Sequence, residues 1–106
     1  MKATILHNPR CSKSREALAL LHAAGAEVTV VEYLKTPPSR DTLARLCARA
    51  GIAPRAALRG DAPTVASDDA ALDLMARDPA TIERPWVETA KGACLARPPE
   101  RVRDLL

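Results

Sequence analysis

The amino-acid sequence predicts an α/β fold in which helices flank a mixed four-stranded sheet. Three observations support this fold class: a strand, helix, strand pattern in the first third of the chain, amphipathic helical patterns in the middle, and a hairpin pattern followed by a helix at the end. The expected order is therefore β-α-β, helices, β-β-α. With 106 residues the chain has room for one domain, residues 1–106, which buries roughly two-thirds of its unfolded surface.

The first unit is a strand, a helix and a second strand. The segment ATIL (3–6) ends at the turn-forming HNP and predicts a short buried strand. Apolar residues at 17, 18, 21 and 24 recur at helical spacing before Gly25, which predicts a helix over 12–24. The β-branched segment 27–33 predicts a second strand. Two strands joined by one helix are expected to lie parallel in a right-handed unit.

The middle of the chain predicts two more helices. Ser39 can cap a helix that ends at Gly51, and the segment SDDAALDLMARDP repeats this pattern from a serine cap to a proline stop. The first of these helices carries a buried stripe made of Leu43, Leu46, Cys47 and Ala50. Cys47 is therefore expected to be a core residue.

The last third predicts a hairpin and a final helix. RPWVET and ACLAR, separated by AKG, are typical of two antiparallel strands, and RPPERVRDLL places proline at a helix start. This order, with a cysteine where the first strand meets the first helix, is the thioredoxin-like arrangement. In such a sheet the ends of the first strands form the natural site for a ligand.

Composition excludes several function classes. The net charge of +3 comes from scattered basic residues, and only Trp86 and Tyr33 are aromatic, so we expect no nucleic-acid partner. No apolar run is long enough to span a membrane, and no secretory signal precedes the first strand. Three widely spaced cysteines without a CxxC pair indicate neither a disulfide framework nor a metal site. We expect a cytoplasmic protein without a membrane partner or a bound cofactor.

The segment LHNPRCSKSR (6–15) places Cys11 where a nucleophile would be useful. The start of a helix presents unpaired N–H groups and a partial positive charge, both of which favour a thiolate. Arg10, Lys13 and Arg15 add cations nearby, and His7 adds another when it is protonated. The same groups would attract an oxyanion. We therefore expect a thiolate that faces an anionic substrate.

The residues around Cys11 also bear on other roles for this cysteine. A small residue at a helix cap is the simplest alternative, although serine would cap better. The cysteine phosphatases need arginine six positions after their cysteine, where this chain has Ala17. Ser14 gives a Cys-x-x-Ser spacing without the second thiol of a dithiol pair, so a resolving thiol would have to come from elsewhere.

Three segments together carry a resemblance to a known family. HNPRCSKSREALALL, EYLKTPPSRDTLARL and RPWVETAKGACLARPPERVRDLL resemble, in this order, the glutaredoxin-dependent arsenate reductase family, including its arsenate-reductase-like members. The resemblance implies a thioredoxin-like fold, arsenate or a similar oxyanion as the ligand, and reduction of arsenate to arsenite. It also implies that Cys11 forms a bond to arsenic, that glutathione joins as co-substrate, and that glutaredoxin supplies electrons.

The resemblance also assigns residues to the site. Arg59, Arg84 and Arg97 match the arginines that hold the oxyanion, and Ser14 is placed with them in substrate binding. His7 matches the histidine that helps to keep the catalytic thiol ionised. The fixed fork of donors on arginine suits a tetrahedral oxyanion better than the point charge of lysine.

Three details accompany these assignments. Pro85 resembles the proline that is cis in thioredoxin-like folds, opposite the reactive cysteine. Cys94 lies three residues before Arg97, and alternation along a strand places it on the face away from the site, which disfavours a resolving role. Residues 60–83 form a shorter segment than the family has, so the sequence leaves open whether Arg59 reaches the site.

Two further functions remain open from the sequence. One is a non-catalytic redox regulator that binds a protein partner, which the Cys-x-x-Ser spacing disfavours because related regulators tend to use a cysteine pair. The other is a glutathione-dependent monothiol oxidoreductase that does not act on arsenate.

Overall fold

The four strands form one mixed sheet in the order β2-β1-β3-β4. β1 (Lys2–His7) runs parallel to β2 (Glu27–Glu32) and antiparallel to β3 (Trp86–Thr89), which pairs antiparallel with β4 (Gly92–Leu95). The computed structural model, which describes residues 1–106, therefore confirms the predicted thioredoxin-like sheet.

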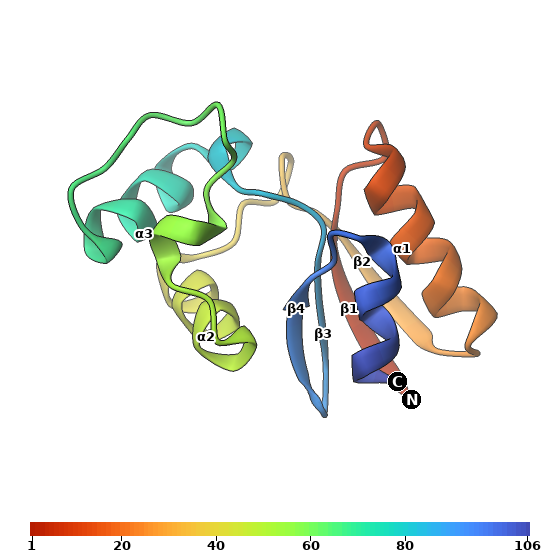
Figure 1. The fold of residues 1–106 in the computed structure, drawn as a ribbon. Coiled ribbons are helices and arrows are strands. Elements are labelled where there is room, and N and C mark those ends of the chain that lie inside the picture. The colour runs from red at the N-terminus through yellow and green to blue at the C-terminus, as the bar shows by residue number, and fades with distance from the viewer.

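Helices cover both faces of this sheet (Figure 1). α1 (Ser12–Ala23) and the 3₁₀ helix η3 (Pro99–Leu105) lie on one side, while α2 (Arg40–Ala50) and α3 (Asp68–Arg77) lie on the other. Alternation along β1 separates the two cores, because Ile5 packs towards α1 and Leu6 towards α2. No helix is long and apolar enough to cross a bilayer.

The caps of α2 and α3 are those that the sequence predicts. Ser39 Oγ accepts a hydrogen bond from the Thr42 N–H at 3.1 Å, and Ser67 Oγ accepts one from the Ala70 N–H at 3.1 Å. Gly51 ends α2 with a φ of 67°, a left-handed conformation that glycine adopts without strain. These local signals are independent of the rest of the fold.

Some predicted details differ in the structure. Ala24 is exposed, because α1 ends at Ala23 and leaves this residue in the C-terminal cap. The final helix is a 3₁₀ helix, and two others, η1 (Pro54–Ala57) and η2 (Pro79–Thr81), were not predicted. All three begin with proline, which suits the first position of a helix, and short helices often take the tighter form.

Candidate active site

The thiol of Cys11 sits at the junction between β1 and α1. Cys11 is the N-terminal cap of α1, its N–H donates to the Asn8 carbonyl at 2.9 Å, and it is partly exposed. Asn8 also accepts the Arg10 N–H on Oδ1 at 3.0 Å, so its side chain helps to build the turn. The first N–H groups of α1 have no partner within the helix and remain available to an anion.

His7 and Ser14 form a buried pair behind this turn. Nδ1 of His7 lies 2.6 Å from Ser14 Oγ, which also accepts the Asn8 N–H at 3.0 Å. Ser14 is completely buried, in contrast to our expectation that it contacts the substrate, because α1 packs this side of its first turn onto the end of β1. The structure therefore gives Ser14 a positioning role, in which it holds the turn and the imidazole.

The surroundings of His7 affect how readily its ring is protonated. Burial lowers the pKa of His7, Glu32 acts to raise it, and Arg15 acts to lower it further, with burial as the largest cause. The lowered pKa disfavours the protonated ring, which weakens any positive charge that His7 contributes near the thiol. Its catalytic role stays a prediction, since its hydrogen bond goes to Ser14 and not to the thiol.

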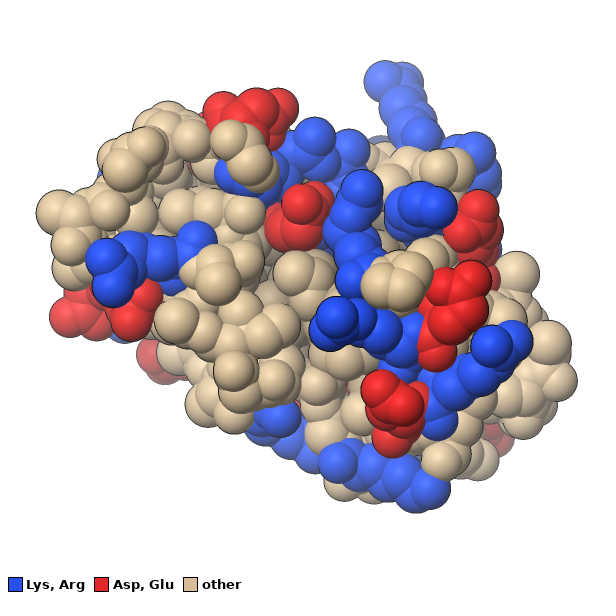
Figure 2. Space-filling view, in the orientation of Figure 1, with Lys and Arg blue, Asp and Glu red and all other residues tan.

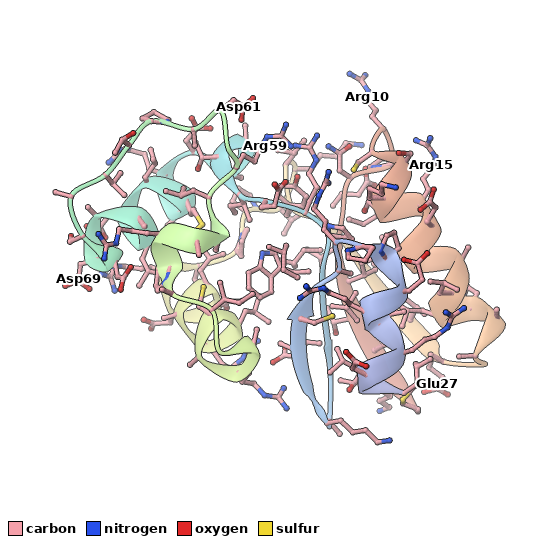
Figure 3. The ribbon with its side chains drawn as sticks, viewed as in Figure 1. Arg10, Arg15, Glu27, Arg59, Asp61 and Asp69 are labelled. Carbon is pink, nitrogen blue, oxygen red and sulfur yellow. The ribbon has the colours of Figure 1, made fainter.

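The cations next to Cys11 in sequence are occupied elsewhere or point outward. Arg15 donates from Nη1 to the Pro9 carbonyl at 2.8 Å, and Lys13 lies 3.8 Å from Glu16. Arg10 projects away from the molecule (Figure 3). The positive charge at the thiol therefore comes from a distant part of the chain.

That charge is supplied by Arg97, which follows β4. Its Nη1 lies 4.0 Å from Cys11 Sγ and donates to the Arg84 carbonyl at 3.1 Å. The Arg84–Pro85 peptide bond is cis, as predicted, and the Arg97–Pro98 bond is cis as well. Folding thus brings the two arginine-proline segments together beside the thiol.

Arg84 is the least engaged of the three predicted arginines. It takes part in none of the ion pairs of the structure, and its Nε is buried without a hydrogen-bond partner. A buried donor without a partner is costly, and an anion that binds there would satisfy it. Arg84 is therefore available to a ligand.

Arg59 reaches the same cluster through a carboxylate. A bridge between Leu58 and Ile82 fixes its backbone, and Arg59 Nη1 lies 3.7 Å from Glu83 Oε1. The same oxygen lies 3.9 Å from Arg97 Nη1. The short 60–83 segment therefore leaves Arg59 linked to the site, although its Nε also bonds Asp61 at 3.1 Å on the outer side (Figure 3).

Basic side chains dominate this end of the molecule. Figure 2 shows Lys and Arg side chains gathered above the ends of β1 and β3, with acidic side chains among them. The surface over the Cys11 turn is thus suited to attract an anion.

Two residues of the site were missed by sequence reasoning. Glu83 directly precedes Arg84, and a carboxylate beside a motif arginine was a usable signal. Tyr33 belongs to the EYLKTPP motif but was assigned only to a strand. Its hydroxyl is buried without a partner that meets hydrogen-bond geometry. Burial raises its pKa, and the nearby Asn8 side chain and then the charge of Arg59 act to lower it.

The other thiols lie outside this site. Cys47 is buried in the core, as predicted, and burial raises its pKa. Cys94 packs against the α1 and η3 side of the sheet, on the face opposite to the one expected for a resolving thiol. Burial and, secondarily, Asp104 raise the pKa of Cys94 to about 11. Neither thiol is placed to resolve Cys11, and no cluster of His, Cys, Asp and Glu is arranged to bind a metal.

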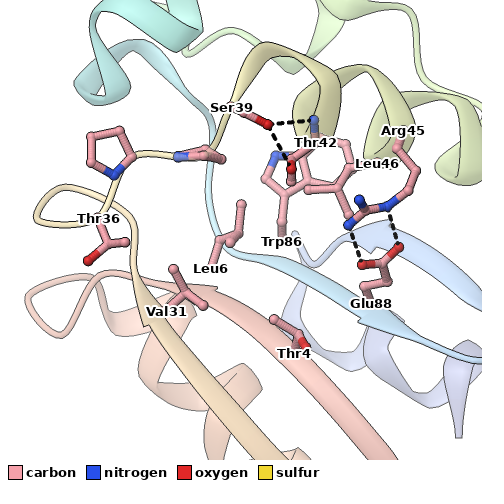
Figure 4. A pocket seen from close by; sticks show the side chains of 12 residues that line it. Thr4, Leu6, Val31, Thr36, Ser39, Thr42, Arg45, Leu46, Trp86 and Glu88 are labelled. Carbon is pink, nitrogen blue, oxygen red and sulfur yellow. Dashed lines mark hydrogen bonds and ion pairs between the residues drawn. The ribbon is translucent and has the colours of Figure 1, made fainter.

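The main hollows of the surface do not contain the thiol. A groove of about 280 Å³ lies between β1, β2 and the start of α2, with Leu6, Val31 and Trp86 in its lining and the Arg45–Glu88 ion pair at one side (Figure 4). A more open hollow of about 380 Å³ is lined by residues around Arg59. Cys11 therefore lies outside both hollows, at a partly exposed position near the arginines.

Comparison with known proteins shows the family and the fold of the chain. Residues 6–105 match the model of the ArsC family. The chain is 44% identical over its full length to an arsenate reductase of Rhizobium meliloti (strain 1021), of which it covers 82%. It is 45% identical to an arsenate reductase of Escherichia coli, over 97% of this chain and 79% of that protein. The solved arsenate reductase from Vibrio cholerae matches with a TM-score of 0.92 at 41% identity, over 100% of this chain and 98% of that one.

Proposed function

The chain belongs to the ArsC family, and on this premise we propose that it is an arsenate reductase that converts arsenate to arsenite. The observation that carries the proposal is the contact between Cys11 Sγ and Arg97 Nη1 at 4.0 Å, beside Arg84, whose Nε has no hydrogen-bond partner. A thiol, a helix start and guanidinium groups are what a nucleophile needs in order to meet a tetrahedral dianion.

Binding is the first task of the site. Arg97 offers N–H donors beside the thiol, Arg84 adjoins it in the fold, and Arg59 approaches from the loop that follows η1. The N–H groups at the start of α1 add further donors next to the thiol. Together they neutralise the charge of arsenate and hold arsenic in line with the sulfur, so that attack does not require two anions to meet without compensation.

The chemistry then proceeds at the sulfur of Cys11. The thiolate attacks arsenic, one arsenate oxygen leaves as water after protonation, and a sulfur–arsenic bond remains. Glutathione displaces a second oxygen in the same way. Glutaredoxin then attacks the glutathione sulfur, a mixed disulfide forms, and the electron pair of the broken bond reduces arsenic from the +5 to the +3 state. Water releases arsenite and frees the thiolate.

An external thiol is favoured by the placement of the cysteines. Cys47 is buried in the core, and Cys94 faces the opposite side of the sheet with its pKa raised to about 11. The chain therefore offers no second thiol to Cys11, which is the situation that glutathione would resolve. We place the protein in the cytoplasm, where a free thiol of this kind stays reduced.

A coupled assay tests this proposal. Wild type and Cys11→Ser are compared for arsenate-dependent oxidation of NADPH in the presence of glutathione, glutaredoxin and glutathione reductase. Turnover that is present in wild type and lost in Cys11→Ser is the expected result. Turnover that persists in Cys11→Ser, or that is missing in both proteins, would contradict the proposal.

The same assay separates the alternatives. Reduction of a glutathionylated substrate without arsenate turnover would favour a monothiol oxidoreductase. A stoichiometric protein partner without either activity would favour a redox regulator.

A further inference from the structure

Glu83 occupies the centre of the arginine cluster. Its Oε1 lies 3.7 Å from Arg59 Nη1 and 3.9 Å from Arg97 Nη1, and it accepts the Arg84 N–H at 3.2 Å. Its backbone N–H donates to the Ala57 carbonyl at 2.9 Å, which fixes the residue in place. One carboxylate therefore lies near the guanidinium groups of Arg59 and Arg97 and accepts the backbone N–H of Arg84.

The contacts of Glu83 with the two guanidinium groups are loose. Both distances exceed the usual range for a hydrogen bond, so the carboxylate balances charge without saturating the donors. Arg97 Nη1 is also the atom nearest to Cys11 Sγ, at 4.0 Å. An oxyanion at the thiol must therefore share this guanidinium with the carboxylate.

The third arginine has no such counter-ion. Arg84 makes no ion pair, and its Nε is buried without a partner. The carboxylate thus offsets the charge of Arg59 and Arg97, whereas no carboxylate pairs with the guanidinium of Arg84. The side chain of Glu83 is 24% exposed, so its charge is only partly screened by water.

We propose that Glu83 is a built-in counter-ion that competes with the oxyanion for Arg59 and Arg97, and so sets the affinity of the site. The proposal rests on the proposed function in that it uses the same oxyanion site. Because repulsion grows with the charge of the ligand, a dianion is disfavoured by a carboxylate at this position. Removal of the negative charge therefore strengthens dianion binding, whereas a residue that only positioned the arginines would weaken it when changed.

Sulfate binding tests the proposal directly, since sulfate is a tetrahedral dianion that does not react. Calorimetric titrations at constant ionic strength compare Cys11→Ser with the double variant Cys11→Ser, Glu83→Gln. Glutamine keeps the shape and the oxygen that accepts the Arg84 N–H, so the fold is retained. We expect about tenfold tighter sulfate binding in the double variant, for partly screened charges at this separation.

Two further variants in the same background serve as controls. Glu83→Asp keeps the charge and should bind sulfate within about threefold of the parent. Asp61→Asn removes a carboxylate that is 77% exposed on the outer side of Arg59, where water screens the charge, and should change the affinity less than about twofold. In the enzyme with Cys11 intact, Glu83→Gln should lower the KM for arsenate.

The outcomes separate this proposal from the proposed function. Unchanged or weaker sulfate binding in the Glu83→Gln variant overturns the counter-ion role, as does the lack of sulfate binding in every variant. Tighter binding supports it even if the wild-type protein fails to reduce arsenate. Arsenate turnover in wild type without any effect of Glu83→Gln on sulfate would leave the enzyme function intact and remove only this inference.

Discussion

Two clusters in this protein each combine one glutamate with two arginines, but at different distances. In the first, the carboxylate of Glu88 lies between Arg45 and Arg49, on the face of the sheet that α2 covers. It accepts hydrogen bonds from Arg45 at 2.9 and 3.2 Å and from Arg49 at 2.8 Å. The hydrogen bond from Arg45 is the largest cause of the lowered pKa of Glu88. This cluster ties α2 to β3.

The second cluster is that of Glu83 with Arg59 and Arg97 at the thiol. Glu83 Oε1 lies 3.7 and 3.9 Å from the Nη1 atoms of Arg59 and Arg97, beyond hydrogen-bond range, so this carboxylate does not occupy the guanidinium donors. The comparison shows that the carboxylate–guanidinium distance distinguishes a structural ion pair from an anion-binding site. Where the carboxylate saturates its arginines, the cluster stabilises the fold, and where it does not, the arginines can still bind an anion.

Replacement of an arginine by lysine should have the largest effect on activity, and only in the cluster at the thiol. Arg97→Lys keeps the charge but loses the fork of donors, so we expect kcat/KM for arsenate to fall about 100-fold. Arg45→Lys makes the same change in the structural cluster and should leave turnover at the wild-type rate. The NADPH-coupled assay measures both, and an Arg97→Lys enzyme within threefold of wild type would contradict a site role for this residue.

Neutralisation of Glu88 should lower the free energy of unfolding more than neutralisation of Glu83. Glu88→Gln removes hydrogen bonds to a charged acceptor that is 19% exposed, so the free energy of unfolding should fall by about 1–2 kcal/mol. Glu83→Gln removes only loose contacts and should change it by less than about 0.5 kcal/mol. Urea unfolding followed by circular dichroism decides the point. Equal losses in the two variants would erase the distinction between the clusters.

Acid should remove the contribution of the structural cluster. The hydrogen bond from Arg45 lowers the pKa of Glu88 in the folded protein below its ordinary value of 4.5, so the unfolded chain takes up a proton first as the pH falls. The stabilisation is therefore complete above pH 4.5 and is lost as the pH falls through the lower folded value. We expect the stability difference between wild type and Glu88→Gln to shrink below that pH. A difference that stays constant in urea titrations on both sides of pH 4.5 would contradict the assignment.

The smallest expected effect concerns two buried hydroxyl groups. Thr89 Oγ1 donates to the Leu105 carbonyl at 3.0 Å, whereas the hydroxyl of Tyr33, beside the site, has no partner. Thr89→Val should therefore lower the free energy of unfolding by about 1 kcal/mol, and Tyr33→Phe should change it by less than about 0.5 kcal/mol. The same urea titrations measure both variants. A larger loss in Tyr33→Phe than in Thr89→Val would show that the tyrosine hydroxyl has a structural partner.

Much of the fold follows from signals that act over short distances. The caps at Ser39, Ser67 and Gly51 can be read within a few residues, and the structure has them where they were predicted. The unpredicted 3₁₀ helices at 54–57 and 79–81 are too short to show a periodicity. Element order and sheet type were therefore accessible from sequence, while short irregular turns were not.

The site was only partly accessible for the same reason. The position of Cys11 at a helix start is local, and it was predicted. The charges around it are not local, because Arg97 meets the thiol across 86 residues, and the neighbouring Arg15 bonds the turn. The burial of Ser14 and the central place of Glu83 depend on how α1 and the 79–85 segment pack, which no pattern in the sequence specifies.

Trp86 gives this protein a built-in optical probe. It is the only tryptophan of the chain, its side chain is 1% exposed, and it follows the Arg84–Pro85 segment directly. Its fluorescence emission therefore has one origin, at the boundary between the core and the arginine cluster. Unfolding would shift that emission to the red as the indole enters water, and an anion that moves Arg84 would change its intensity. Binding and unfolding can thus be followed on the unlabelled protein.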